Sequence, residues 1–98
     1  MATYVMLMHY TDTGIQHFKA IGDRLEHARR GAAELGAKLE AFYLTMGEYD
    51  AVAIVEAPDD ETVAKLSLVN AANGRVRIRT MRAFTEPETI RLASELPV

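Results

Sequence analysis

The stretch LTMGEYDAVAIVEAP, residues 44–58, predicts a β-hairpin around which the other elements of the chain are arranged. Residues 51–55 are rich in β-branched side chains and have no helical period, which indicates a strand. The preceding run, residues 39–46, carries aromatic and threonine side chains typical of a second strand. Gly47 supplies the permissive backbone of a tight turn, and Pro58, which lacks an N–H, suits the end of a strand.

Alternating side chains predict two further strands, over residues 3–10 and residues 75–84. One face of the first strand carries Tyr4, Met6, Met8 and Tyr10. Its other face carries Thr3, Val5, Leu7 and His9. On the strand predicted over residues 75–84, alternation places Arg75, Arg77 and Arg79 on one face and Arg82 on the other. Because the first strand is largely apolar on both faces, we expect both of them to be covered.

Two long helices are predicted between the strands. Apolar residues at three- and four-residue spacing indicate an amphipathic helix over residues 24–35, with Gly22 as an interruption before it and Asp23 as its cap. Asp59 is a good cap for a second helix, which ends at Asn73-Gly74.

Two shorter helices complete the prediction. A helical segment after the first strand is expected to point Ile15 and Phe18 inward. Near the end of the chain, Thr85 and Glu88 have the spacing of a capping box, which predicts a short terminal helix.

The predicted order is β-α-β-β-α-β followed by a C-terminal helix, in a single domain of residues 1–98. This order predicts a ferredoxin-like α+β sandwich of the dimeric α/β-barrel type, with an antiparallel sheet and both long helices on one face. The other face would remain apolar and bare, and monomers rarely expose such a contiguous patch. We therefore expect the chain to form a homodimer or higher homo-oligomer, packed sheet to sheet.

Composition excludes several classes of function. The net charge of −3 argues against nucleic acid as a partner, and no apolar run approaches the length of a membrane span. The chain has no cysteine, and its three histidines lack a local metal-binding spacing, so we expect no metal site. The chain has no nucleotide-binding glycine loop and no nucleophile elbow, which argues against dehydrogenase, NTPase and hydrolase chemistry, and we expect no cofactor. Without a signal peptide pattern, the expected location is the cytoplasm.

The sequence resembles the GYD-domain family, small bacterial proteins of the dimeric α/β-barrel type. The residues that carry the resemblance are Thr11-Asp-x-Gly14-Ile15, Tyr43-x-Thr45-x-Gly47-x-Tyr49-Asp50, Glu56-x-Pro58-Asp59, Gly74-x-Val76-Arg77 and Arg82-Ala83-Phe84-Thr85. Glu48 stands between the glycine and the tyrosine of the GYD signature. The resemblance covers nearly the whole chain apart from the last helix, and it implies a ferredoxin-like fold and self-association. The resemblance does not imply an activity, and analogy with other proteins of this fold rests on the fold alone.

Three residues are candidates for proton transfer: His9, Asp50 and Glu56. Each also has a structural interpretation. His9 lies at a strand end, and Asp50, beside the turn, is expected to accept backbone N–H bonds. Glu56 lies on a largely apolar strand face, where a carboxylate needs a partner, and Arg77, Arg79 or Arg82 are candidates for an ion pair.

The ligand-binding candidates are the residues on one face of the first strand: Tyr4, Met6, Met8 and Tyr10. Such a stripe is usually packed core, but methionines line adaptable apolar surfaces and tyrosines add a polar tip. We place a ligand between the uncovered face of the sheet and neighbouring helices or a partner subunit, near His9 and Tyr10.

Three functions remain open at this stage. The first is a self-associating module that binds a small apolar or weakly acidic molecule. The second is a cofactor-independent enzyme of the dimeric α/β-barrel type, monooxygenase-like or isomerase-like. The third is a structural oligomer without a cavity.

Overall fold

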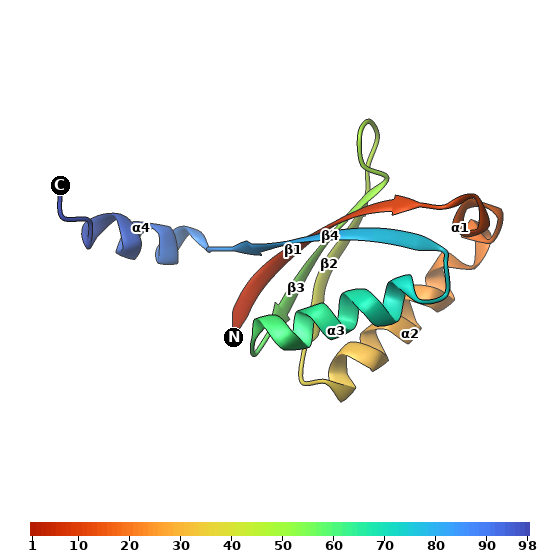
Figure 1. Cartoon of the computed structure of the whole chain (residues 1–98), viewed down its shortest axis with the longest axis horizontal. Coiled ribbons are helices and arrows are strands. Elements are labelled where there is room, and N and C mark those ends of the chain that lie inside the picture. The colour runs from red at the N-terminus through yellow and green to blue at the C-terminus, as the bar shows by residue number, and fades with distance from the viewer.

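The computed structural model describes residues 1–98 and contains one antiparallel sheet with the strand order β2-β3-β1-β4. The strands are β1 (Ala2–Tyr10), β2 (Lys38–Leu44), β3 (Ala51–Ala57) and β4 (Val76–Ala83). Two long helices, α2 (Ile21–Glu34) and α3 (Asp60–Ala71), cover one face of this sheet (Figure 1). The predicted ferredoxin-like α+β fold is thereby confirmed.

Three short helical elements complete the chain: α1 (Asp12–Gln16), the 3₁₀ turn η1 (Phe18–Ala20) and α4 (Glu86–Ser94). The first two connect β1 to α2 at one end of the sheet. In contrast, α4 continues beyond β4 and projects away from the rest of the molecule (Figure 1). The predicted capping box is present, because Thr85 Oγ1 accepts from the Glu88 N–H and the Glu88 carboxylate accepts from the Thr85 N–H.

The strand register decides which side chains share a face. On the helix-covered face, Tyr4, Met6 and Met8 of β1 lie opposite Val55, Ala53 and Ala51 of β3. On the open face, Val5 and Leu7 lie between Ile54 and Val52 on one side and Met81 and Arg79 on the other. Both central strands are therefore largely apolar on both faces, which the alternation predicted for β1.

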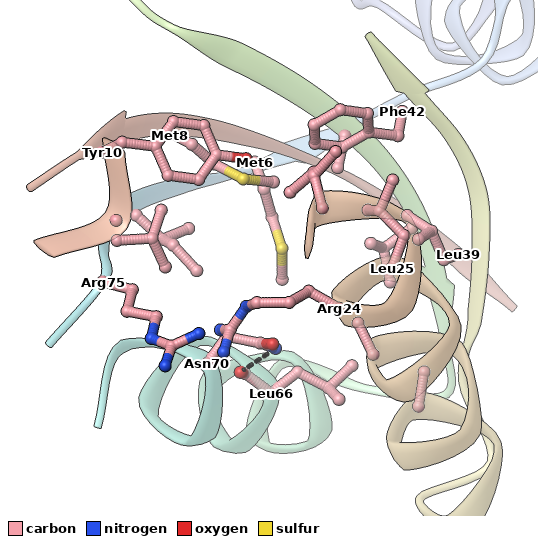
Figure 2. Close-up of a pocket in the computed structure, with 18 of the residues that line it drawn as sticks. Met6, Met8, Tyr10, Arg24, Leu25, Leu39, Phe42, Leu66, Asn70 and Arg75 are labelled. Atoms are coloured by element: carbon pink, nitrogen blue, oxygen red, sulfur yellow. Dashed lines mark hydrogen bonds between the residues drawn. The ribbon is translucent and has the colours of Figure 1, made fainter. Parts of the chain in front are cut away.

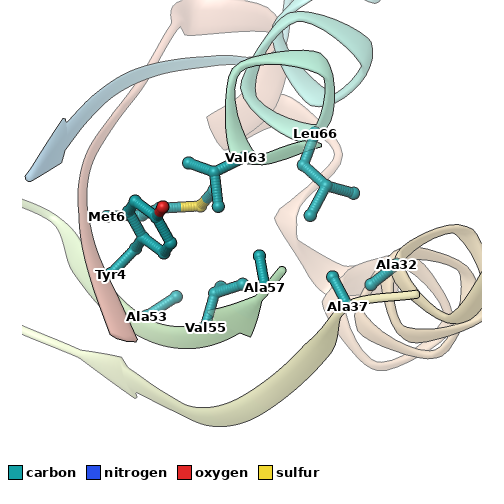
Figure 3. Close-up of a cluster of buried hydrophobic side chains, with 9 residues drawn as sticks. All are labelled: Tyr4, Met6, Ala32, Ala37, Ala53, Val55, Ala57, Val63 and Leu66. Carbon is teal, nitrogen blue, oxygen red and sulfur yellow. The ribbon is translucent and has the colours of Figure 1, made fainter. Parts of the chain in front are cut away.

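The core lies between the sheet and the two long helices (Figure 3). It consists of Tyr4, Met6, Ala32, Ala37, Ala53, Val55, Ala57, Val63 and Leu66. Four of these nine side chains are alanines, which allow helices and sheet to approach closely but fill little volume. A core built from such small side chains leaves space toward one end of the sandwich.

Several local predictions are corrected by the structure. The helix α2 begins at Ile21 and runs through Gly22 without interruption, and Asp23 lies in its first turn instead of capping it. Ile15 points outward, with 58% of its surface exposed, whereas Phe18 is half-buried as expected. The helix starts early because Ile21 packs inward, and this outweighs the cost of a glycine in the first turn.

The hairpin loop is longer than a tight turn. The strand β2 ends at Leu44, and residues 45–50 form the connection to β3. The Thr45 N–H donates to the Asp50 carbonyl at 2.8 Å, and Thr45 Oγ1 donates to the Tyr49 carbonyl at 2.6 Å. Gly47 has a φ of +101°, which explains the glycine at this position.

None of the helices is long and apolar enough to cross a membrane.

Candidate functional site

A cavity of about 90 Å³ lies between the sheet and the helices, at the end of the sandwich that the small core residues leave open. Its sheet side is formed by Met6, Met8, Tyr10 and Phe42, and Phe18 and Leu25 face them from η1 and α2. Most of the residues that line it are apolar. A polar or strongly hydrated molecule would lose its water shell there without compensation, so the body of any occupant must be apolar.

Besides Tyr10, four polar side chains line the cavity: His17 between α1 and η1, Arg24 of α2, Asn70 of α3 and Arg75 just before β4. Figure 2 shows both guanidinium groups next to α3, across the cavity from Met8 and Tyr10. Neither arginine forms an ion pair with a carboxylate of this chain. Asn70 is held in place because its amide donates to the Leu66 carbonyl at 2.8 Å. The cavity therefore combines an apolar interior with two arginines that lack anionic partners.

Tyr10 links the cavity to the hairpin. Its ring contacts Phe18 edge to face, with 5.1 Å between the ring centroids. Burial raises the pKa of Tyr10, the positive charge of Arg24 opposes this change, and the negative charge of Asp50 adds to it. The phenol is therefore neutral at physiological pH and is available as a hydrogen-bond donor.

A close backbone contact positions Arg75. Thr11 donates through its backbone N–H to the Arg75 carbonyl at 3.1 Å and through its hydroxyl to the Gly74 carbonyl at 2.6 Å. A Cβ atom on Gly14 would lie 2.0 Å from the Arg75 carbonyl oxygen. Only glycine permits this approach of α1 to the start of β4. The Thr11–Gly14 part of the family signature therefore has a packing role beside the cavity.

The structure divides the four predicted ligand-binding residues. Met6, Met8 and Tyr10 line the cavity, whereas Tyr4 lies in the core and donates a hydrogen bond of 2.5 Å to Asp60 Oδ1. The cavity is on the helix-covered face, so the placement of this stripe at the uncovered face was wrong. The alternation identified the residues, but only the helices decide which face they cover.

The three candidates for proton transfer do not converge. His9 lies on the open face, where its ring packs against Tyr49 with 4.7 Å between centroids. Asp50 accepts a hydrogen bond of 2.9 Å from the Tyr10 N–H. Glu56 pairs in register with Thr3, six residues along β1 from His9 and therefore about 20 Å away. None of the three lines the cavity.

The predicted partners of Glu56 lie elsewhere. No arginine forms an ion pair with Glu56, so that expectation was wrong within one chain. Arg82 instead stacks on the rings of Tyr4 and Phe84 and lies 4.0 Å from Glu88. Arg77 and Arg79 are on the open face near His9, opposite the end that holds Glu56. No group of three or more His, Asp or Glu side chains is arranged to hold a metal ion.

Sequence reasoning missed Arg24 and assigned Arg75 to the wrong face. The signal for Arg24 was available, since it shares the inward stripe of α2 with Ile21, Leu25 and Ala28 at three- and four-residue spacing. The interruption predicted at Gly22 separated Ile21 from the helix and thereby shortened this stripe. Arg75 precedes the first paired residue of β4, and strand alternation therefore does not apply to it.

Comparison with known proteins places these features in context. A family model described as the GYD domain matches residues 4–93. A Thermus thermophilus protein named glutamine synthetase and cystathionine beta-lyase binding protein is 31% identical over 91 residues, which cover 92% of this chain and 96% of that protein. The crystal structure of FFRP-DM1 is similar with a TM-score of 0.57 at 17% identity, over 86% of this chain and 100% of that one. This last similarity concerns the fold alone.

Proposed function

The chain belongs to the GYD-domain family, and from that premise we propose that it is a self-associating module that binds a small, apolar, weakly acidic molecule. The observation that carries the proposal is the cavity beside Met8 and Tyr10, with Arg24 and Arg75 free of carboxylate partners. Buried or half-buried guanidinium groups usually have an anionic partner, and here the chain itself supplies none. A ligand carboxylate would fill that role, and its apolar chain would contact the methionines.

Self-association is supported by the open face of the sheet. Val5, Leu7, Val52 and Ile54 form its centre, and no helix of the same chain covers them. A face of this composition is typical of an interface. Light scattering should give the mass of a dimer or a larger oligomer at micromolar concentration, whereas a stable monomer would contradict this part of the proposal. Replacing Ile54 by Lys should dissociate the oligomer, and replacing the exposed Glu26 by Lys should not.

Ligand binding is tested by calorimetric titration with hexanoate and hexanol, which share an apolar chain and differ in charge. Hexanoate should bind at least about tenfold more tightly, because only its carboxylate can accept charge-assisted hydrogen bonds from the arginines. Arg24→Gln should remove this preference, and Arg29→Gln, on the exposed side of the same helix, should retain it. Equal binding of both probes would contradict the acidic part of the proposal. Mass spectrometry under non-denaturing conditions, on protein from its native cell, would reveal a retained ligand.

A second candidate function is the binding of a metabolic enzyme. It is supported by the Thermus relative, whose name states that it binds glutamine synthetase and cystathionine beta-lyase. We propose that the same class of partner contacts this chain on its exposed surface. Purified glutamine synthetase and cystathionine beta-lyase from the same cell should be retained by the immobilised protein. Failure of both to bind, with the oligomer intact, would contradict this second function and leave the first one standing.

A further inference from the structure

The C-terminal helix α4 has no packing partner within its own chain. None of its side chains is buried: Ile90 exposes 63% of its surface, and Leu96, just after the helix, exposes 60%. We call residues 84–98, which follow β4 and include α4, the arm. Phe84, where the arm leaves the sheet, is also exposed. The projecting arm contributes to a radius of gyration of 14.9 Å, compared with about 13 Å for a compact domain of this length. Figure 1 shows the arm at the far left, apart from the sandwich.

The sequence nevertheless specifies this helix strongly. Its capping box is complete, and Pro87 lies in the first turn, where proline is favourable. Its apolar residues, Ile90, Leu92 and Ala93, lie on one side, and Glu88 and Arg91 lie on the other. A helix of nine residues is marginal in water by itself. An amphipathic helix with such definite ends therefore requires an apolar surface to pack against.

Charge indicates which surface this is. The arm carries Glu86, Glu88 and Glu95 against a single Arg91. It leaves the sheet at the end where Ala83 pairs with Thr3 and where Glu56 lies on the open face. The opposite end of the open face is basic, because Arg77 pairs with His9 and Arg79 with Leu7. Lys38 of β2 lies opposite Glu56, so the net negative charge at the first end belongs to the arm. Each molecule thus has one end that carries an acidic, partly apolar helix and another end where the open sheet face is basic.

We propose that α4 is an exchanged arm that docks on the basic end of the open sheet face of a second copy of this chain. In a two-fold dimer whose facing strands run in opposite directions, the end of each sheet that carries the acidic arm lies over the basic end of the other sheet. The same symmetry brings each arm to its partner's Arg77 and Arg79, so the contact is reciprocal. This inference rests on the self-association proposed above and adds the arm and the strand direction to it.

Because the chain has no native cysteine, single introduced cysteines test the contact directly. Equal amounts of a Ser94→Cys protein and a differently tagged Arg77→Cys protein are mixed and treated with a short bis-maleimide. The mixed dimer should form in several-fold higher yield than with Ala33→Cys, an exposed position in the helical layer, as the second protein. Equal yields would overturn the inference, and so would a cross-link within one chain of the Ser94→Cys, Arg77→Cys double variant.

Charge reversal provides a second test. Arg79→Glu alone and Glu95→Arg alone should each weaken dimerisation about tenfold or more, and their combination should recover most of the loss. Circular dichroism checks that each variant is folded, and Arg29→Glu on the exposed side of α2 is the control. A dimer that all three changes leave unaffected would refute the arm contact and leave the proposed self-association intact. A monomeric wild-type protein would refute both.

Discussion

At the scale of single residues, Asp50 joins three segments of the chain. Its carboxylate accepts the Tyr10 N–H at 2.9 Å, and its own N–H donates to the Met8 carbonyl at 2.9 Å. Its carbonyl accepts the Thr45 N–H across the hairpin loop. The aspartate of the family signature thus ties the end of β1 to the hairpin. It satisfies backbone groups and does not face the cavity.

Replacing Asp50 by Ala should therefore reduce stability and not primarily a reaction. The Tyr10 N–H would lose its acceptor in a half-buried position, at a cost of about 1–3 kcal/mol in the free energy of unfolding. Urea denaturation measures this change, and Asp50→Asn, which keeps an acceptor oxygen, should lose less. The interpretation would be reversed by an equally stable Ala variant that no longer binds hexanoate.

Tyr4 makes a pH-dependent contribution. The hydrogen bond to Asp60 is the main cause that raises the pKa of Tyr4, and burial adds to it. A pKa raised on folding stabilises the native state below about pH 10, and this stability is lost as the pH rises through the folded-state pKa.

Replacing Asp60 by Asn should lower the pKa of Tyr4 toward the ordinary tyrosine value. Tyrosinate absorbance during an alkaline titration measures the change, and Tyr4→Phe identifies the transition that belongs to Tyr4. An unchanged titration in the Asn variant would contradict the assigned hydrogen bond.

At the scale of elements, two glycines in helices differ in the space that surrounds them. Gly14 in α1 lies against the Arg75 carbonyl, whereas Gly22 in α2 has no atom within 4 Å of an added Cβ. The first contact fixes the start of β4, and with it Arg75, next to the cavity. The second position is part of an ordinary helix.

The two glycine-to-alanine changes should therefore have opposite effects. Gly14→Ala should lower the free energy of unfolding by about 1–3 kcal/mol, because the methyl group would overlap a backbone oxygen. Gly22→Ala should raise it by about 0.5–1 kcal/mol, because alanine favours the helix and meets no obstacle. Chemical denaturation of both variants decides the matter, and equal effects would show that α1 is free to move away from β4.

At the scale of the whole molecule, the cavity exists because a core rich in alanine does not fill the sandwich to its end. Met6 and Met8 alternate on the same strand, yet they differ in position. Met6 is 4% exposed and belongs to the packed core, whereas Met8 is only half-buried and lies at its margin. The two residues looked equivalent in the sequence.

Tryptophan substitution should distinguish the two methionines. Met8→Trp should fill the cavity, abolish hexanoate binding and leave the denaturation midpoint nearly unchanged. Met6→Trp should lower the free energy of unfolding by about 1–3 kcal/mol, because Met6, although it also borders the cavity, is packed among core residues that a larger ring would displace. If Met8→Trp also unfolds the protein, its stripe is ordinary core and the ligand site is refuted.

The sequence by itself determined the order of the elements, the alternation on the strands and the caps at Asp59 and Thr85. These features depend on neighbours a few residues away, so they can be read locally. The resemblance to the GYD-domain family rested on such local signatures and was confirmed.

Only the tertiary structure decided which sheet face the helices cover, and therefore that Met8 and Tyr10 line a cavity instead of an open surface. It also brought Arg24 and Arg75, 51 residues apart in the chain, to the same cavity, and it left Glu56 without an ion pair to any arginine. These outcomes depend on strand register and helix placement, which are set by burial summed over the whole chain. No local pattern of residues contains this information.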